Sequence, residues 1–380
     1  VPLVELVTAR AVVDRQYPIR KSANIQNILK METQSNVASN SEIQEQQQHQ
    51  TEKLTSTDTI KERIKREASW PFVLFYIHLN ILGLYGIFIM FTNTTFLTIL
   101  FTFALTFLGI LGATAGAHRL WAHQTYTAST SLRVFLMLCQ TIAGQGPIYR
   151  WVQTHRLHHQ KFRQEDDPFY SARSFMAAQV NAQIMSYTRE QQQLLSQVDM
   201  SDIEQDKVVM FQKKYYWVLY FVLHVLLPVN APLEYWGDSI AAATFVAFSL
   251  RYLIVLNVCW LINSAHFIWG LDKNFKPSDS NSVFFITKSY WPQYHYLLPN
   301  DYQSGEFGDY GSDFVTAMIR VFAALDMATD LRTISSVAVR KGLTTAVETG
   351  RPIVECIQEH ATEEMNEMPK NHFLNRDRFM

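Results

Sequence analysis

Five of the chain's twelve histidines lie in two short clusters with spacings suited to metal binding. The first cluster holds His118 and His123, and the second holds His155, His158 and His159. The i, i+3 and i+4 spacing of the second cluster places three imidazoles on one helix face, as a shared metal ion requires. The i, i+5 spacing of the first cluster slightly exceeds one turn, so we expect it where a helix ends or loosens.

The ligand type narrows the choice of metal. An all-imidazole set suits iron, zinc or copper and excludes magnesium and calcium, which prefer oxygen ligands. The sequence contains no Glu-x-x-His pair of the kind that soluble di-iron bundles use. Cys139, Cys259 and Cys356 are far apart and form no C-x-x-C pair, which fits a working face in a reducing compartment. The alternative, interfacial histidines that bind no metal, is disfavoured by five histidines at these spacings.

Long apolar stretches must position these histidines. We predict four membrane spans, at residues 70–91, 96–117, 215–233 and 240–262. The expected fold is therefore an all-α integral membrane protein with four transmembrane helices in two hairpins. Arg251 lies in the fourth span and is costly in lipid, so we expect it to face the bundle interior or a cavity. Its role is then either to bond a structural partner or to act in catalysis or substrate binding.

Charged residues flanking the spans predict their orientation. The basic residues near the span ends are Lys61, Arg63, Lys65, Arg66, Arg119, Lys213, Lys214, Lys273 and Lys276. All of them fall on one side, whereas the loop after the third span carries only the acidic Glu234 and Asp238. Because basic loops stay in the cytosol, we expect both termini and both histidine clusters to face it.

The two ends of the chain differ in composition from its centre. We expect a polar, disordered tail at residues 1–66, a membrane domain at 67–340 and a charged C-terminal tail at 341–380. The formal net charge is −1 and no basic stripe is present, so no nucleic-acid partner is expected.

Several stretches between about Trp70 and Arg340 resemble the membrane acyl-CoA desaturases, specifically the insect Δ9-type branch, which is stearoyl-CoA desaturase-like. The matching stretches are 116–123, 151–159, 166–168, 199–202, 210–216, 260–266, 308–310 and 329–333. Each includes a motif in the family's order, such as Asp166-Asp167-Pro168.

The resemblance implies four spanning helices under a cytosolic helical cap that carries a histidine-rich metal site. It also implies an endoplasmic reticulum enzyme, an oxidoreductase whose di-iron centre uses O2 to introduce a cis double bond at the Δ9 position of a fatty acyl-CoA. Electrons would come from cytochrome b5 and its reductase. The implied metal ligands are His118, His123, His155, His158, His159, His266 and His295, with Asn263 as a candidate ligand through water.

The third histidine box departs from the family pattern. The family has His-Asn-Tyr-His-His where this chain has Pro292-Gln293-Tyr294-His295-Tyr296. Proline offers no ligand, and a neutral phenol is a poor one unless a metal deprotonates it. Tyr296 as a tyrosinate ligand is the less favoured reading.

Two further departures concern a ligand pair and the substrate head group. Asn263 and His266 are three residues apart, whereas the family spaces them by four. Gln153-Thr154 replace an Arg-Asp pair used near the CoA moiety, and glutamine cannot replace a bidentate phosphate contact. Nearby basic residues either compensate or are ordinary surface charges: Arg150, Lys161 and Arg163.

These departures leave three hypotheses. The first is an acyl-CoA desaturase, or a related lipid oxygenase, of altered specificity and altered iron ligation. The second is a catalytically impaired protein of the desaturase fold that binds acyl lipids or a membrane partner. The third, weaker hypothesis is a mononuclear metal protein that uses the remaining histidines.

Overall fold

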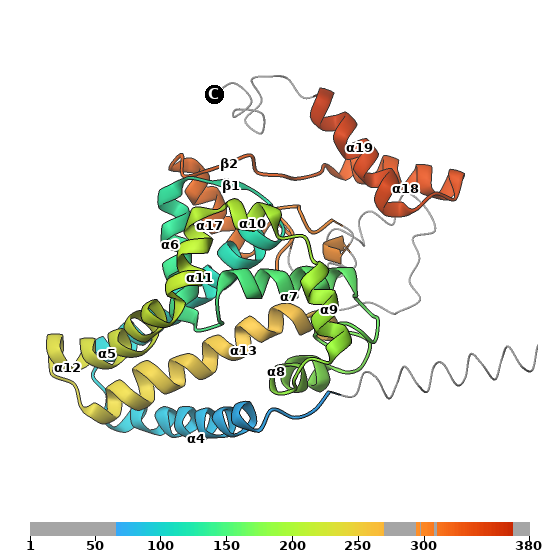
Figure 1. Cartoon of the computed structure of the whole chain (residues 1–380). Coiled ribbons are helices and arrows are strands. Elements are labelled where there is room, and N and C mark those ends of the chain that lie inside the picture. The colour runs from blue at the N-terminus through green and yellow to red at the C-terminus, as the bar shows by residue number, and fades with distance from the viewer. Residues whose placement is uncertain (1–65, 270–293, 297, 308–309, 368–380) are drawn as a thin grey trace, which may run out of the picture. The chain divides into compact units, whose positions relative to one another are not determined.

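The computed structural model describes residues 66–269, 294–296, 298–307 and 310–367 (Figure 1). The chain divides into two compact units, Val1–Lys65 and Arg66–Met380, and the described residues all belong to the second. The described residues are mostly helical, and their one pair of named strands, β1 (Thr127–Ala128) and β2 (Ala328–Thr329), is antiparallel. The predicted all-α fold is confirmed. Pro292 and all but the last residue of the predicted N-terminal tail lie outside the described residues.

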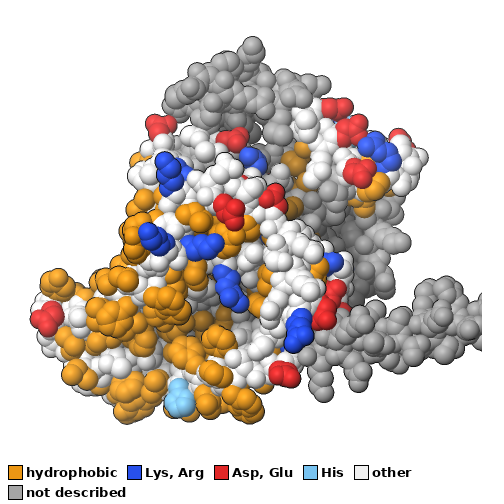
Figure 2. Space-filling model, viewed as in Figure 1, with side chains coloured by type: hydrophobic (Ala, Val, Ile, Leu, Met, Phe, Trp, Pro, Cys, Tyr) orange, Lys and Arg blue, Asp and Glu red, His pale blue; other side chains and the backbone are white. Residues whose placement is uncertain are grey.

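Four helical segments are long and apolar enough to cross a membrane, as predicted. The first segment is α4 (Trp70–Thr92), and the second, Phe96–Ala122, consists of α5 (Phe96–Leu111) and η1 (Gly112–Ala122). The third segment, Lys207–Trp236, consists of α11 (Lys207–Tyr220), η3 (Phe221–Leu226) and α12 (Leu227–Trp236). The fourth, Ala242–Ser264, consists of η4 (Ala242–Leu250) and α13 (Arg251–Ser264). Large apolar side chains stay exposed on them, among them Phe91 at 80% and Trp217 at 76%. Figure 2 shows hydrophobic side chains gathered over the region of α4, α5 and α12. Because so wide an apolar surface suits lipid and not water, the chain is a multi-pass membrane protein.

The third of these segments begins earlier than the predicted span at 215. The carboxylate of Asp206 accepts hydrogen bonds from the backbone N–H groups of Val208 and Val209, and so caps a helix that starts at Lys207. The Lys213 ammonium lies 3.3 Å from the centroid of the Tyr149 ring. The Asp206 cap and the cation–π contact of Lys213 thus stabilise a helical stretch that precedes the apolar part of this segment.

Arg251 lies in the bundle interior, as predicted, and is fully buried. Its guanidinium donates to the carbonyl oxygens of Ala247, Ile142 and His224 at 2.9–3.0 Å. These carbonyls belong to three different helices, so Arg251 has structural partners that join α6, η3 and η4.

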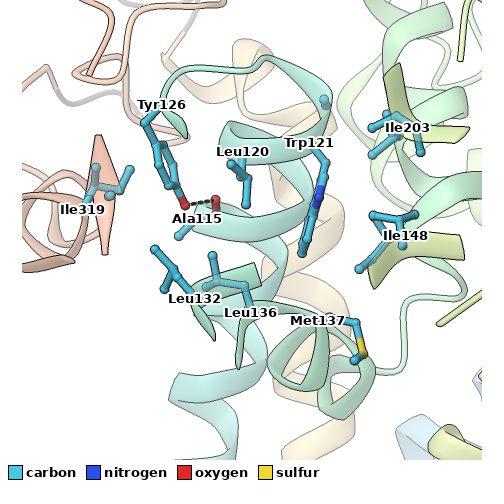
Figure 3. Packing of buried hydrophobic residues seen from close by; sticks show 14 of the residues in the cluster. Ala115, Leu120, Trp121, Tyr126, Leu132, Leu136, Met137, Ile148, Ile203 and Ile319 are labelled. Carbon is cyan, nitrogen blue, oxygen red and sulfur yellow. Dashed lines mark hydrogen bonds between the residues drawn. The ribbon is translucent and has the colours of Figure 1, made fainter. Parts of the chain in front are cut away.

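The remaining helices lie toward one end of the four long segments (Figure 1). They are α6 (Thr130–Ala143), α7 (Ile148–Gln160), η2 (Ala177–Asn181), α8 (Ala182–Ile184), α9 (Arg189–Gln197), α10 (Ser201–Gln205), α14 (His266–Trp269), α17 (Phe314–Ala324), α18 (Ser336–Thr349) and α19 (Ile353–Glu367). The largest apolar core joins η1 to α6, α7 and α17 through Trp121, Leu136, Ile148 and Ile319 (Figure 3). This core fixes the two helices that carry the histidine clusters relative to each other.

Two further helices lie near the C-terminal end of the described residues. Helix α18 starts at Ser336, and it pairs with α19. Val339, Leu343 and Ile357 from these two helices form a buried cluster with Tyr294 and Leu298. The third-box segment therefore packs against the C-terminal helices. The domain boundaries after 66 and 340 stay predictions.

Candidate metal centre

The first histidine cluster lies on a π-helical segment. His118 belongs to η1 and His123 caps its C-terminus, where its backbone N–H donates to the carbonyl of His118 at 3.1 Å. This i to i+5 bond is the π-helical repeat, so two residues five apart share one face. The two ring centroids lie 4.7 Å apart. The expectation that the helix loosens at this spacing is confirmed.

The second cluster lies on the last two turns of α7. The centroid of the His155 ring is 5.8 Å from that of His158 and 4.8 Å from that of His159, so the three share one face, as predicted. The start of this helix is anchored by Gln212 of α11, whose side-chain oxygen accepts from the backbone N–H of Ile148 at 2.8 Å. Because Gln212 is fully buried, this bond sets the position of α7 against a membrane helix.

Four buried imidazoles from three separate segments converge. His118, His123, His155 and His295 each offer one ring nitrogen, and these atoms lie within 4.8 Å of one another. The Nε2 atoms of His123 and His155 are 2.8 Å apart. His159 borders the group, with its ring centroid 4.4 Å from that of His123. The term four-histidine group is used below for His118, His123, His155 and His295.

Most of these imidazoles are oriented through Nδ1. The Nδ1–oxygen distances are 2.8 Å for His118 to Glu306, 2.8 Å for His155 to Asn263 and 3.3 Å for His295 to Ser304. A proton held on Nδ1 leaves Nε2 with a lone pair for a metal ion. Asn263 therefore lies against a histidine ring; its predicted contact to metal through water stays a prediction.

Glu306 is a site residue that sequence reasoning missed. It is fully buried and receives two hydrogen bonds from the Arg119 guanidinium, at 2.7 and 2.8 Å. Burial by itself would raise the pKa of Glu306, but Arg119 and the hydrogen bonds from Arg119 and His118 hold it well below its usual value. The carboxylate is therefore charged and accepts the Nδ1–H of His118. No local spacing links a glutamate to a histidine 188 residues away.

The electrostatics of the cluster favour neutral imidazoles. Burial, followed by the neighbouring imidazoles, lowers the pKa well below the ordinary value for His123, His155, His159 and His295. Neutral imidazole is the form that binds metal. The buried Nε2 atoms of His118 and His159 have no hydrogen-bond partner among the described residues, which a bound cation would correct. The four-histidine group therefore fits one metal ion.

His158 has a different environment. Its Nδ1 lies 2.9 and 3.0 Å from the two carboxylate oxygens of Asp167, and its Nε2 lies 2.7 Å from the Tyr296 hydroxyl. The Tyr296 ring stacks on Phe162, with centroids 3.4 Å apart and planes 11° apart. Burial, with a further contribution from Asp167, raises the pKa of Tyr296 well above its usual value, so the phenol is neutral and donates. Both nitrogens of His158 are therefore occupied.

His266 lies on the Tyr296 side of the site, outside the four-histidine group. Its ring centroid is 4.9 Å from that of Phe162 and 6.4 Å from that of His158. Burial, with a contribution from His158, lowers the pKa of His266 to about 3. Of the seven predicted ligands, the structure thus brings four together and places His159 beside them. It leaves two outside the group: His158, which is bonded to the Tyr296 hydroxyl, and His266.

The residues at the family's Arg-Asp position bond within the protein. The Gln153 amide donates to the carbonyl of Leu195 at 2.9 Å, and the Thr154 hydroxyl donates to the carbonyl of Arg150 at 2.9 Å. Both side chains therefore donate hydrogen bonds to backbone carbonyls of this chain.

Comparison with known proteins decides the family. No family model matches the chain. An acyl-CoA Delta-9 desaturase of Acheta domesticus is 38% identical over 278 residues, which cover 72% of this chain and 77% of that protein. The chain belongs to the acyl-CoA desaturase family. An acyl-CoA Delta-12 desaturase of Tribolium castaneum is 34% identical, with 76% and 83% covered, and the stearoyl-CoA desaturase of Homo sapiens is 35% identical, with 72% and 77% covered. The predicted membership is confirmed.

Proposed function

We propose that this chain is an O2-dependent oxidoreductase that introduces a cis double bond into a fatty acyl-CoA. The observation that carries the proposal is the convergence of the four-histidine group at the end of apolar helices in a member of the acyl-CoA desaturase family. The relatives' names include Delta-9 and Delta-12 desaturases, so membership alone does not select the position. The Δ9 position rests on the resemblance to the insect Δ9-type branch.

We propose iron as the metal. Bound iron with O2 would supply an oxidant strong enough to remove hydrogen from an unactivated methylene pair, which no side chain can do. The chain's own residues would hold and orient the ion. Glu306 and Asn263 keep protons on the Nδ1 atoms of His118 and His155, and burial keeps water from their Nε2 atoms. Two ions are the family expectation, of which the four-histidine group supports one.

Membrane placement and electron supply complete the proposal. The one-sided distribution of basic residues supports an orientation with both termini and the metal site in the cytosol. The endoplasmic reticulum as the host membrane rests on the family resemblance. A site on that side can take electrons from cytochrome b5 and its reductase. With Gln153 and Thr154 bonded to backbone, CoA phosphates would need other cations, and Arg150 and Arg163 are nearby in sequence.

A second candidate function has its own support. Tyr296 and its bond to His158 favour a catalytically impaired desaturase-fold protein that binds acyl lipids or a membrane partner.

One experiment distinguishes the two functions. Membranes containing the full chain are incubated with stearoyl-CoA, NADH, cytochrome b5 and its reductase, and the fatty acids are analysed by mass spectrometry. We expect a monounsaturated product that is absent with His123→Ala. Retained acyl-CoA binding without product would contradict the proposed desaturase activity and support the second candidate function.

A further inference from the structure

The two halves of the histidine site differ in what their nitrogens contact. In the four-histidine group, the ring nitrogens face one another, and the buried Nε2 of His118 has no hydrogen-bond partner among the described residues. In the other half, the Nε2 of His158 already has one, the hydroxyl of Tyr296 at 2.7 Å. The halves are adjacent, because the His159 ring lies 4.7 Å from the Tyr296 ring by centroids.

The Tyr296 hydroxyl competes with a metal ion for the same place. A hydrogen bond to Nε2 lies along its lone pair, and a metal ion bound there would lie about 2.0–2.1 Å from the nitrogen. The phenolic oxygen at 2.7 Å leaves no room for that ion. The ring cannot swing away cheaply, because it is stacked on Phe162.

Both ring nitrogens of His158 are used in hydrogen bonds, whereas those of His266 have no hydrogen-bond partner among the described residues. The phenol donates to Nε2 of His158, and the Nδ1–H of His158 donates to Asp167. Asp167 accepts in addition from the backbone N–H groups of Phe169 at 2.8 Å and Ser171 at 3.1 Å. At His158, a chain of hydrogen bonds therefore takes up the lone pair that a metal ion would need.

We propose that this chain binds a single metal ion, at His118, His123, His155 and His295, and that the Tyr296 hydroxyl closes the neighbouring position. The inference rests on the metal-binding part of the proposed function and is independent of the reaction. Tyr296 is then a structural replacement for a ligand, and His158 serves to hold it.

The test is the number of Zn²⁺ ions per chain. The full-length protein is solubilised in detergent, stripped with a chelator, exposed to excess Zn²⁺, desalted and analysed by plasma mass spectrometry. We expect about one ion in the unmodified chain and about two in Tyr296→His, which supplies an imidazole at the closed position. Tyr296→Phe keeps the stacked ring without a ligand atom and should hold one ion. His158→Asn should also hold one, whereas His118→Ala with His155→Ala should hold none.

Several results would overturn the inference. Two ions in the unmodified chain would show that the hydroxyl does not close the neighbouring position, and one ion in Tyr296→His would show that another group closes it. Loss of the ion in His158→Asn would make His158 a ligand. With Fe³⁺ in place of Zn²⁺, a visible phenolate-to-iron band that vanishes in Tyr296→Phe would make Tyr296 a ligand. No ion in the unmodified chain would also remove the metal from the proposed function, whereas the acyl-CoA product assay tests the reaction separately.

Discussion

Glu306 connects a metal-binding histidine to a buried ion pair. One of its oxygens faces both His118 and Arg119, and the other faces Arg119 alone. The carboxylate therefore fixes the ring of His118 while it neutralises a guanidinium that is itself fully buried. Asp313 also contacts Arg119, at 2.7 Å, but has no histidine partner among the described residues, which makes it a matched control.

We expect Glu306→Gln to weaken metal binding by about 10–100-fold, because the Nδ1–H of His118 loses its charged acceptor. Competition for Zn²⁺ between the protein and a chelator of known affinity measures the change. Asp313→Asn should leave the metal affinity within about twofold, since the partners of Asp313 among the described residues are Arg119 and Thr316, and neither is a predicted metal ligand. Equal weakening in both variants would mean that the ion pair, and not the histidine contact, matters.

Asp301 offers a pH-dependent test at the turn after the third box. It accepts hydrogen bonds from the hydroxyls of Tyr294 and Tyr310, yet burial raises the pKa of Asp301 above its usual value. The folded chain thus holds this proton more tightly than the unfolded chain. The resulting stability is complete below the unfolded pKa of about 4 and is lost as pH rises through the folded pKa.

Asp301→Asn should remove that loss. From about pH 4 upward, the unmodified chain should therefore lose thermal stability relative to the variant. Unfolding in detergent, followed at several pH values for both proteins, measures the difference. Parallel pH profiles would show that Asp301 does not carry this dependence.

At the scale of elements, a close helix contact sets where the first histidine cluster lies. A Cβ added to Gly112, at the start of η1, would lie 2.1 Å from the backbone nitrogen of Gln140 in α6. Backbone atoms cannot give way as side chains can, so only glycine permits this approach. At Gly116, one turn later, the nearest atom is a ring carbon of Trp121 at 3.1 Å.

Gly112→Ala should therefore destabilise the fold by about 1–3 kcal/mol or more, as overpacking forces α6 away from η1. Gly116→Ala should cost clearly less, because a side chain can shift. Thermal unfolding of the two variants in one detergent compares them directly. An equal or smaller loss for Gly112→Ala would contradict the close contact between η1 and α6.

The sequence predicted the helices better than the contacts between them. Hydropathy predicted the four apolar helices, and the i+5 spacing of His118 and His123 predicted a loosened helix, because both follow from local periodicity. The family pattern predicted His295 and indicated that Tyr296 was unusual. Periodicity could not predict that Tyr296 bonds His158 or that Glu306 reaches His118, since these contacts join segments distant along the chain.

At the scale of the whole molecule, the proposed orientation can be tested with introduced cysteines. Cys139, Cys259 and Cys356 are all buried, so a membrane-impermeant maleimide should label a new exposed cysteine selectively. Asn93, between α4 and α5, and Ser196, in α9, are both exposed. The proposal places Ser196 in the cytosol and Asn93 across the membrane.

In sealed microsomes, we expect Ser196→Cys to react with the maleimide at once. Asn93→Cys should react only after the membrane is made permeable, so its labelling should rise severalfold on adding detergent. Gel shift or mass spectrometry reads the labelled fraction. The opposite pattern would reverse the orientation and put the histidines on the side away from cytosolic electron donors.

The account depends most on the four-histidine group being a metal site. X-ray absorption at the metal edge, on detergent-solubilised protein loaded with Zn²⁺, tests this most directly. We predict about four nitrogen neighbours at about 2.0–2.1 Å, with the outer-shell scattering of imidazole rings. A shell of oxygen neighbours without that imidazole scattering would show that the ion binds elsewhere and would contradict the account.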